Sequence, residues 1–281
     1  MMSSICGSFA QPGRRTLWAT ILVVCLLTAP GINWWSASEA GASPQLSVIY
    51  VPTPERLVHR MLEMAEVRED DYVIDLGSGD GRIVVAAVRD FNARAAHGID
   101  LDPQRVAEGR ENARRAGVED RATFEEGDLF EMDFSEATVL TMYLLQTLNL
   151  RLRPVILETM RPGTRVVSHA FNMGDWEPDQ HEVVDGRNAY LWIVPAQVQG
   201  RWQLSTADGR EVTLSLTQSY QNISGHAVVE GASMDLNDVN LRGDEIRFVI
   251  GSDNYVGRVE GDTMVPVQTS GAAQGWNARR N

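Results

Sequence analysis

Residues 73–82 read Val-Ile-Asp-Leu-Gly-Ser-Gly-Asp-Gly-Arg, and residues 98–103 read Gly-Ile-Asp-Leu-Asp-Pro. The first stretch is an apolar strand that ends near Asp75 and runs into a glycine loop, whose backbone can approach a ligand closely because it lacks Cβ atoms. A helix beginning near Gly81 would point its free N–H groups at that ligand. Asp100 ends the next strand, where an acid binds ribose in dinucleotide folds. The two stretches therefore predict a nucleoside-binding strand–loop–helix–strand unit.

The acids of the loop favour one class of cofactor. The loop has the form D-x-G-x-G-x-G, with Asp75 before the glycines and Asp80 among them, whereas nicotinamide and flavin folds use G-x-G-x-x-G. Two carboxylates would repel a pyrophosphate but attract a cofactor that carries an ammonium and a sulfonium. We therefore expect S-adenosylmethionine rather than NAD; an ordinary glycine-rich turn is the alternative.

Composition excludes several other functions. The 281 residues suffice for one large domain or two modest ones, and the net charge of −13 argues against a general nucleic-acid binder. Cys6 and Cys25 are the only cysteines, so the part after residue 44 has no disulfide and no cysteine-based metal site. The five histidines show no metal-ligand spacing, and all 25 basic residues are arginines. No metal is expected.

The N-terminal segment, residues 1–44, has the features of a signal peptide or a membrane anchor. Arg14 and Arg15 precede an apolar run over residues 17–29, and no charged residue occurs between positions 16 and 38. Small residues at positions 36–40 suit signal-peptidase cleavage. Because both arginines precede the run, the remainder is expected to be exported, to the periplasm in a bacterium, or held at a membrane. S-adenosylmethionine is made in the cytoplasm, so a cytoplasmic-facing catalytic domain remains the alternative.

Residues 45–196 alternate between strand and helix patterns. Apolar strands are expected at residues 72–76, 96–99, 122–126, 138–143, 165–169 and 190–194, and amphipathic helices precede or separate them. This alternation predicts an α/β domain with a doubly wound, Rossmann-like sheet.

After Pro195 the sequence pattern changes. It predicts short strands separated by turns such as Ala-Asp-Gly and Arg-Gly-Asp. Residues 197–269 are therefore expected to form a small all-β module, either a barrel or a sandwich. The final residues, 270–281, are expected to be a disordered tail.

Five segments together resemble the class I S-adenosylmethionine-dependent methyltransferases. They are Val-Pro-Thr-Pro at residues 51–54, the loop at 75–82, the segment at 98–103, Thr-Val-Leu-Thr-Met-Tyr-Leu-Leu at 138–145, and Val-Val-Ser-His at 166–169 followed by Trp176. Within that class they are most similar to the mitochondrial protein-lysine methyltransferases that act on the ATP synthase c-subunit and on the adenine nucleotide translocase, and to bacterial relatives. The resemblance covers residues 51–178. That group often has proline after Tyr-Leu-Leu, where this chain has Gln146.

The resemblance implies a set of cofactor contacts. Asp100 would hold the ribose hydroxyls, Asp128 would approach the adenine amine, and Thr53 would lie near the methionine moiety. The remaining implied contacts are Asp75, Gly77, Ser78, Gly79, Asp80 and Gly81 at the methionine end, with Leu101 and Leu129 beside the nucleoside.

The substrate side is expected at the ends of the fourth and fifth strands, because ligands bind at the carboxyl edge of such sheets. Tyr143 ends the fourth strand and His169 the fifth. We select both as candidate catalytic residues, His169 as a proton acceptor; simple packing roles are the alternatives. The leading hypothesis is methyl transfer to a protein lysine. A small-molecule or lipid methyltransferase, and an exported non-catalytic binding protein that retains the cofactor fold, are the rivals.

Overall fold

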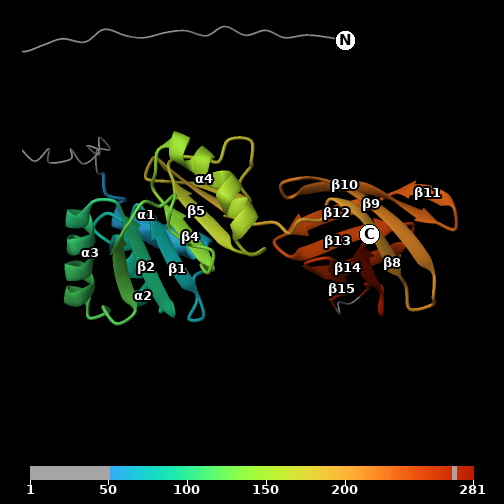
Figure 1. The fold of residues 1–281 in the computed structure, drawn as a ribbon, viewed down its shortest axis with the longest axis horizontal. Helices are drawn as coiled ribbons and strands as arrows, with labels where there is room; N and C mark the ends of the chain where they lie inside the picture. The colour runs from blue at the N-terminus through green and yellow to red at the C-terminus, as the bar shows by residue number, and fades with distance from the viewer. Residues whose placement is uncertain (1–50, 268–270) are drawn as a thin grey trace, which may run out of the picture. The chain divides into compact units, whose positions relative to one another are not determined.

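The structure, a computed structural model, describes residues 51–267 and 271–281 (Figure 1). The predicted signal or anchor, residues 1–44, lies outside these residues. Within the described ranges, no helix combines the length and the apolar character that crossing a bilayer requires.

The first sheet has seven strands in the order β3-β2-β1-β4-β5-β7-β6. The first five, which are parallel, are β1 (Tyr72–Leu76), β2 (Ala95–Asp100), β3 (Ala122–Glu126), β4 (Val139–Met142) and β5 (Arg165–His169). The antiparallel strands β7 (Arg187–Ile193) and β6 (Gln180–Val184) complete it. The strand order reverses between β1 and β4, which places a ligand crevice at their carboxyl ends. The predicted Rossmann-like sheet is confirmed; β6, an edge strand with alternating exposure, was not predicted.

Within residues 51–267, four helices cover the two faces of this sheet. They are α1 (Glu55–Met64), α2 (Arg82–Arg89), α3 (Pro103–Ala116) and α4 (Gln146–Thr159). Helices α1, α2 and α3 share one apolar core with Val73 of β1, whereas α4 packs on the opposite face with Ile74 and Leu76. Neighbouring side chains of β1 thus point to opposite faces, as the pleat requires.

Three glycines let α2 and α3 lie close to the sheet. A Cβ at Gly81, Gly98 or Gly109 would meet the ring of Phe124 at 2.4, 2.6 and 2.7 Å respectively. Phe124, on β3, therefore fills the space that the missing side chains leave. This close packing brings the start of α2 next to the end of β2, where the candidate site lies.

The second sheet forms the predicted all-β module and has nine antiparallel strands. They are β8 (Gly200–Ser205), β9 (Glu211–Ser219), β10 (Asn222–Val229), β11 (Ala232–Asp235), β12 (Asn237–Arg242), β13 (Glu245–Ile250), β14 (Asp253–Glu260), β15 (Thr263–Pro266) and β16 (Asn277–Arg280). The outermost strands, β11 and β12, are joined by the single residue Leu236. The sheet therefore curls toward a barrel around one apolar core.

The expectation of a disordered tail over residues 270–281 is wrong for residues 277–280. Strand β16 pairs with both β8 and β15 in the middle of the sheet. Trp276, which is 1% exposed, contacts Phe248 and Tyr255 edge-on, with ring centroids 6.0 and 5.6 Å apart. Burial of this single large ring anchors a segment whose small and polar composition had suggested disorder.

Candidate functional site

The glycine loop joins β1 to α2 in a conformation that few other residues adopt. Gly77, Gly79 and Gly81 have φ angles of 74°, 54° and 77°, in the left-handed region where a Cβ is strained. The N–H groups of Gly77 and Ser78 donate to the carbonyl oxygen of Ile99, at 2.8 and 3.0 Å. The loop is thereby fastened to the end of β2, beside Asp100.

Asp100 is held in a fixed orientation at that end. Its Oδ2 accepts from the N–H of Gly79 at 2.8 Å, and its Oδ1 accepts from the N–H of Asp102 at 2.9 Å. A carboxylate oxygen has two acceptor positions, so each oxygen retains one for a ligand hydroxyl. The N–H of Gly127 donates to the backbone carbonyl oxygen of Asp100 at 3.0 Å, so the following residue, Asp128, lies beside the end of β2.

The other two nucleoside-side candidates lie near the same edge but differ in burial. Leu129 is half-buried against the core that α4 shares with the sheet. Leu101, directly after β2, is 42% exposed. The ring-packing role of Leu129 and the cofactor contact of Leu101 stay predictions.

Asp75 carries less negative charge than the sequence suggests. Its side chain is buried, and Thr141 Oγ1 donates to its Oδ1 at 2.7 Å. Burial raises the pKa of this carboxyl to about 7; the Thr141 hydrogen bond opposes the rise, and the nearby Asp100 and Asp80 add to it. Asp75 therefore holds a proton at higher pH than an exposed aspartate does.

Asp80 does not present an unpaired charge to a ligand. Arg82 Nε and Nη2 donate to its two carboxylate oxygens at 2.9 and 2.6 Å. Arg82 Nη1 also donates to the carbonyl oxygen of Thr53 at 2.8 Å. The argument that two free acids in the loop select a cationic cofactor is thus wrong for Asp80, whose charge Arg82 offsets.

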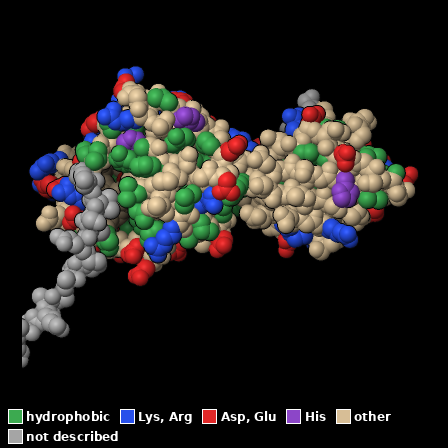
Figure 2. Space-filling view, turned by 90° about the horizontal axis from the view of Figure 1, so that it is seen from above, with side chains coloured by type: hydrophobic (Ala, Val, Ile, Leu, Met, Phe, Trp, Pro, Cys, Tyr) green, Lys and Arg blue, Asp and Glu red, His purple; other side chains and the backbone are tan. Residues whose placement is uncertain are grey.

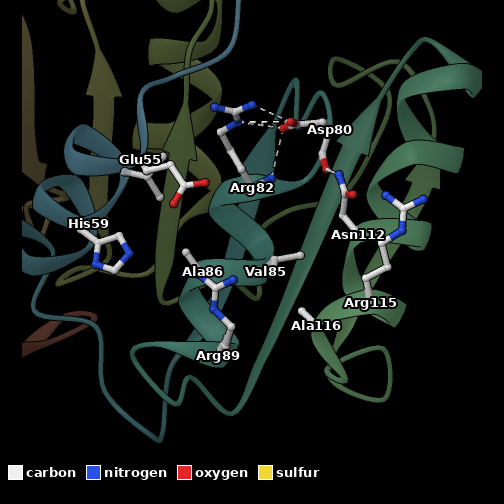
Figure 3. A pocket seen from close by; sticks show the side chains of 11 residues that line it. Glu55, His59, Asp80, Arg82, Val85, Ala86, Arg89, Asn112, Arg115 and Ala116 are labelled. Atoms are coloured by element: carbon white, nitrogen blue, oxygen red, sulfur yellow. Dashed lines mark hydrogen bonds and ion pairs between the residues drawn. The ribbon is translucent and has the colours of Figure 1, made fainter.

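A cavity of about 340 Å³ lies beside this loop, between α1, α2 and α3. Figure 3 shows the Asp80–Arg82 pair near Asn112 at one end of it, and His59 and Arg89 toward the other. Asp80 is the one predicted site residue among those that line it. The cavity therefore adjoins the predicted cofactor position without including its other residues.

An aromatic cluster lies at the ends of β4 and β5. The Tyr143 ring centroid is 3.7 Å from that of His169 and 6.4 Å from that of Phe171. The backbone between the last two turns at Ala170, which has a φ of 68°. The structure thus brings the two predicted catalytic residues together.

His169 is buried and uncharged at neutral pH. Its Nδ1 lies 3.0 Å from Thr53 Oγ1, and both side chains are at most 4% exposed. Burial, together with the smaller effect of the Arg187 charge, lowers the pKa of His169 to about 4. Thr53 links the two halves of the site, since its carbonyl oxygen accepts from Arg82 and its hydroxyl contacts His169.

Sequence reasoning missed Thr141 and Arg82. Thr141 is the register partner of Asp75 across β1 and β4, so correct alignment of the two parallel strands would have found it. Arg82 follows Asp80 by two residues, yet their pairing depends on the turn at Gly81. Among the described residues, no group of three His, Cys, Asp or Glu side chains could hold a metal ion.

The residues present fit S-adenosylmethionine. A Cβ at Gly77 would meet Leu144 Cδ2 at 2.7 Å, so the cradle between β1 and β4 depends on the missing side chain. Ser78 Oγ is buried and has no hydrogen-bond partner, and Asp100 retains acceptor positions. These features match a ligand that carries both donors and acceptors.

The surface of this domain has apolar and mixed-charge character. Val51, Leu101 and Leu145 are 53%, 42% and 47% exposed. Figure 2 shows hydrophobic side chains gathered on the visible face of the α/β domain, with basic and acidic side chains interspersed around them. This face has no uniformly basic area.

Comparison with known proteins agrees with the geometry. The family model of the ANTKMT methyltransferase domain matches residues 75–180. A protein-lysine N-methyltransferase of Saccharolobus islandicus is 46% identical over 151 residues, which are 52% of this chain and 94% of that protein. The mouse lysine N-methyltransferase of the ATP synthase c-subunit is 26% identical over 225 residues, which are 75% of this chain and 89% of that protein.

A solved structure is also similar. A protein of Salinibacter ruber, described as an RNA methyltransferase in complex with S-adenosyl-L-homocysteine, is 51% identical. The match has a TM-score of 0.52 and covers 53% of this chain and 96% of that one. The glycine loop and the oriented Asp100 agree with these matches. The Saccharolobus islandicus relative, 94% of which this chain covers, shows that the chain belongs to the family of S-adenosylmethionine-dependent protein-lysine N-methyltransferases.

Proposed function

We propose that this protein transfers a methyl group from S-adenosylmethionine to the side-chain amine of lysine in a protein substrate. The observation that carries the proposal is the juxtaposition of two groups at one sheet edge. The glycine loop with Asp100 supports cofactor binding, and the cluster of Tyr143, His169 and Phe171 supports acceptor binding. Thr53 contacts His169 of the cluster and Arg82, the residue that directly follows the glycine loop.

The bound cofactor supplies an electrophilic methyl group. Asp100 would hold its ribose, and the glycine loop with Ser78 would hold its methionine part. The chain's own contribution is orientation, because each of these groups is already fixed by backbone hydrogen bonds or close packing.

The acceptor amine must be neutral before it can attack. An ordinary lysine has a pKa of about 10.4, so neutrality at pH 7 costs roughly 4.6 kcal/mol. Tyr143, Phe171 and the uncharged His169 provide a low-polarity surface, which lowers the pKa of an amine by desolvation.

Direct proton transfer to His169 is a poor explanation for that neutrality. A group with a pKa of about 4 is a weak base at neutral pH. We propose that solvent takes the proton as the amine enters the site. His169 would then serve to orient Tyr143 and Thr53, which it contacts directly.

RNA is the second candidate acceptor, because the Salinibacter ruber relative is described as an RNA methyltransferase. Phosphate backbones are bound by basic surfaces, whereas this chain has a net charge of −13 and no uniformly basic area on its visible face. Protein lysine is therefore the better supported acceptor.

One assay separates the acceptor classes. The full-length protein would be incubated with methyl-tritiated S-adenosylmethionine and a cell extract, and the label counted in protein, RNA, lipid and small-molecule fractions. We expect it in protein. The enzyme contains no lysine, so label on a lysine must belong to another protein. Label in another fraction would favour that acceptor, and calorimetric cofactor binding without transfer would favour a non-catalytic binding protein.

We also propose that residues 1–44 direct the protein to a membrane or across it. The arginine pair before the uncharged run supports this proposal. A reporter fused after Asn281 would test it, since the reporter's activity depends on the compartment. A fully soluble cytoplasmic reporter would contradict both the exported and the membrane-held forms.

A further inference from the structure

Three side chains on one face of α4 hold the loop that follows β5. Asn149 Nδ2 donates to the carbonyl oxygen of Phe171 at 3.0 Å, and Arg153 Nη1 donates to that of Met173 at 2.7 Å. Asn172, which lies between these two acceptors, is bound by Gln146. The Nε2 of Gln146 donates to the backbone and side-chain oxygens of Asn172, at 3.1 and 2.9 Å. Three consecutive loop carbonyls thus accept from one helix. We call Gln146, Asn149 and Arg153 the α4 clamp.

The spacing of the clamp follows from helix geometry. Its residues are separated by three and four positions, and side chains at these spacings lie on one face of a helix. Asn149 is fully buried. A buried amide is costly unless it is hydrogen-bonded. The bonds from Nδ2 to the loop, and to Ser168 Oγ at 3.1 Å, offset part of that cost, whereas Oδ1 has no hydrogen-bond partner among the described residues.

The loop requires external support because its start is strained. Ala170 has a φ of 68°, which costs a residue with a Cβ about 1 kcal/mol or more. The N–H of Phe171 donates to the carbonyl oxygen of His169 at 2.8 Å, which closes a tight turn. Such conformations persist when surrounding bonds over-determine them, and the α4 clamp supplies such bonds.

The α4 clamp connects the two strands that carry the aromatic cluster. Helix α4 begins three residues after Tyr143, and the held loop begins directly after His169. A change in the loop would therefore move Phe171 relative to Tyr143.

We propose that Gln146, Asn149 and Arg153 are positioning residues. They fix the position of Phe171 in the aromatic cluster that would contact the acceptor amine. The inference rests on the proposed lysine methylation. The α4 clamp would control acceptor affinity and turnover but not cofactor binding, because none of the predicted cofactor residues lies on α4 or in the loop after β5.

The kinetic test uses the full-length protein with an oligo-lysine peptide of about 20 residues as acceptor. Gln146→Glu keeps the shape of the side chain but replaces its donor with an acceptor that faces the oxygens of Asn172. We expect a roughly threefold to tenfold higher KM for oligo-lysine and a lower kcat, with the Kd for S-adenosylmethionine changed less than twofold. Thr147→Ala, an exposed position in the same helical turn, is the matched control and should leave all three values unchanged.

Arg153 provides a second, conservative pair of variants. Arg153→Ala should give the same kinetic pattern as Gln146→Glu, and Arg153→Lys, which keeps a donor, should recover most of the loss. Because Arg153 pairs with Asp175 as well, Asp175→Asn tests the loss of that ion pair alone and should leave KM and kcat unchanged. Both Gln146 and Arg153 are partly exposed, so these variants should fold.

Hydrogen exchange of the peptide that covers residues 170–174 gives a readout independent of activity. Gly174 N–H donates to Asn172 Oδ1 at 3.0 Å, so release of the loop should speed exchange here in Gln146→Glu and Arg153→Ala. Unchanged KM and kcat in these two variants would overturn the inference, even if exchange became faster. If the wild-type protein showed no activity on oligo-lysine, the proposed function would be contradicted for this acceptor. The exchange data would then decide on the α4 clamp alone. Unchanged exchange in Gln146→Glu and Arg153→Ala would overturn it, and faster exchange would support it.

Discussion

Replacement of Asp75 by asparagine should stabilise the protein at alkaline pH and remove one pH dependence of its stability. Asp75 is buried at the end of β1, and Thr141 Oγ1 is its side-chain donor, at 2.7 Å. Asparagine has the same shape and keeps an acceptor oxygen for Thr141. The substitution therefore removes the buried charge with little change in packing.

The magnitude follows from the pKa of the Asp75 carboxyl, which burial raises from 3.8 to about 7. At about 1.36 kcal/mol per pKa unit, this rise corresponds to roughly 4 kcal/mol. Because the folded-state pKa is the higher one, the group's stabilising contribution is complete below pH 3.8 and is lost as the pH rises through 7. Between about pH 5 and pH 8.5, the stability of Asp75→Asn relative to the wild type should rise by about 3 kcal/mol.

His169 has the opposite pH dependence. Its pKa is lowered from 6.5 to about 4, so the stability it contributes is present above pH 6.5 and is lost as the pH falls through 4. This effect occurs in both proteins and cancels when they are compared at the same pH.

Urea unfolding at several pH values measures the difference. The helical circular-dichroism signal reports on the α/β domain, because all helices of the described residues lie between Glu55 and Thr159. A difference between the two proteins that stays constant from about pH 5 to pH 8.5 would refute the burial argument for Asp75.

Three further predictions concern the site and the module. Gly81→Ala should lower the free energy of unfolding by about 2–4 kcal/mol, because the residue has a φ of 77° and its Cβ would meet the ring of Phe124 at 2.4 Å; urea unfolding at wild-type stability would contradict this. Thr53→Val leaves buried His169 Nδ1 without its partner and should cost about 1–3 kcal/mol, whereas Thr53→Ser should cost less; equal losses in the two variants would be evidence against the hydrogen bond. Deletion of residues 276–281 should expose the core of the β module, because Trp276 and strand β16 complete it; thermal melting and binding of a hydrophobic dye would detect this, and an unchanged melting temperature would argue against a structural role for the strand.

The glycine loop and its strands could be predicted from sequence because their determinants are local. Positive φ angles at Gly77, Gly79 and Gly81 require glycine, and buried parallel strands appear as short apolar runs. Strand β6 was not predicted, because an edge strand with one exposed face lacks such an apolar run. Strand β16 was not predicted either, because its pairing with β8 and β15 is non-local. In this part of the sequence, Trp276 alone indicates burial.

The charges and contacts of the site were harder to predict. The sequence shows that Asp75 and Asp80 are acids but not that burial raises the pKa of one and Arg82 pairs with the other. The α4 clamp could not be predicted from the sequence, for a different reason. Its acceptors are backbone carbonyls, which every residue has, so no residue type marks where Gln146 or Asn149 will bind.

Lysine methylation itself is the central claim, and identification of the modified residue tests it most directly. Substrate protein labelled by the full-length enzyme and S-adenosylmethionine would be hydrolysed to amino acids, and the methylated amino acid identified by mass spectrometry. Asp100→Ala, which removes the carboxylate oriented by Gly79 and Asp102, should weaken cofactor binding about tenfold or more, since hydrogen bonds to a charged group contribute about 1.5–3 kcal/mol each. We predict methyl-lysine with the wild type and much less with Asp100→Ala. Methylation of another amino acid, or none, would contradict the account.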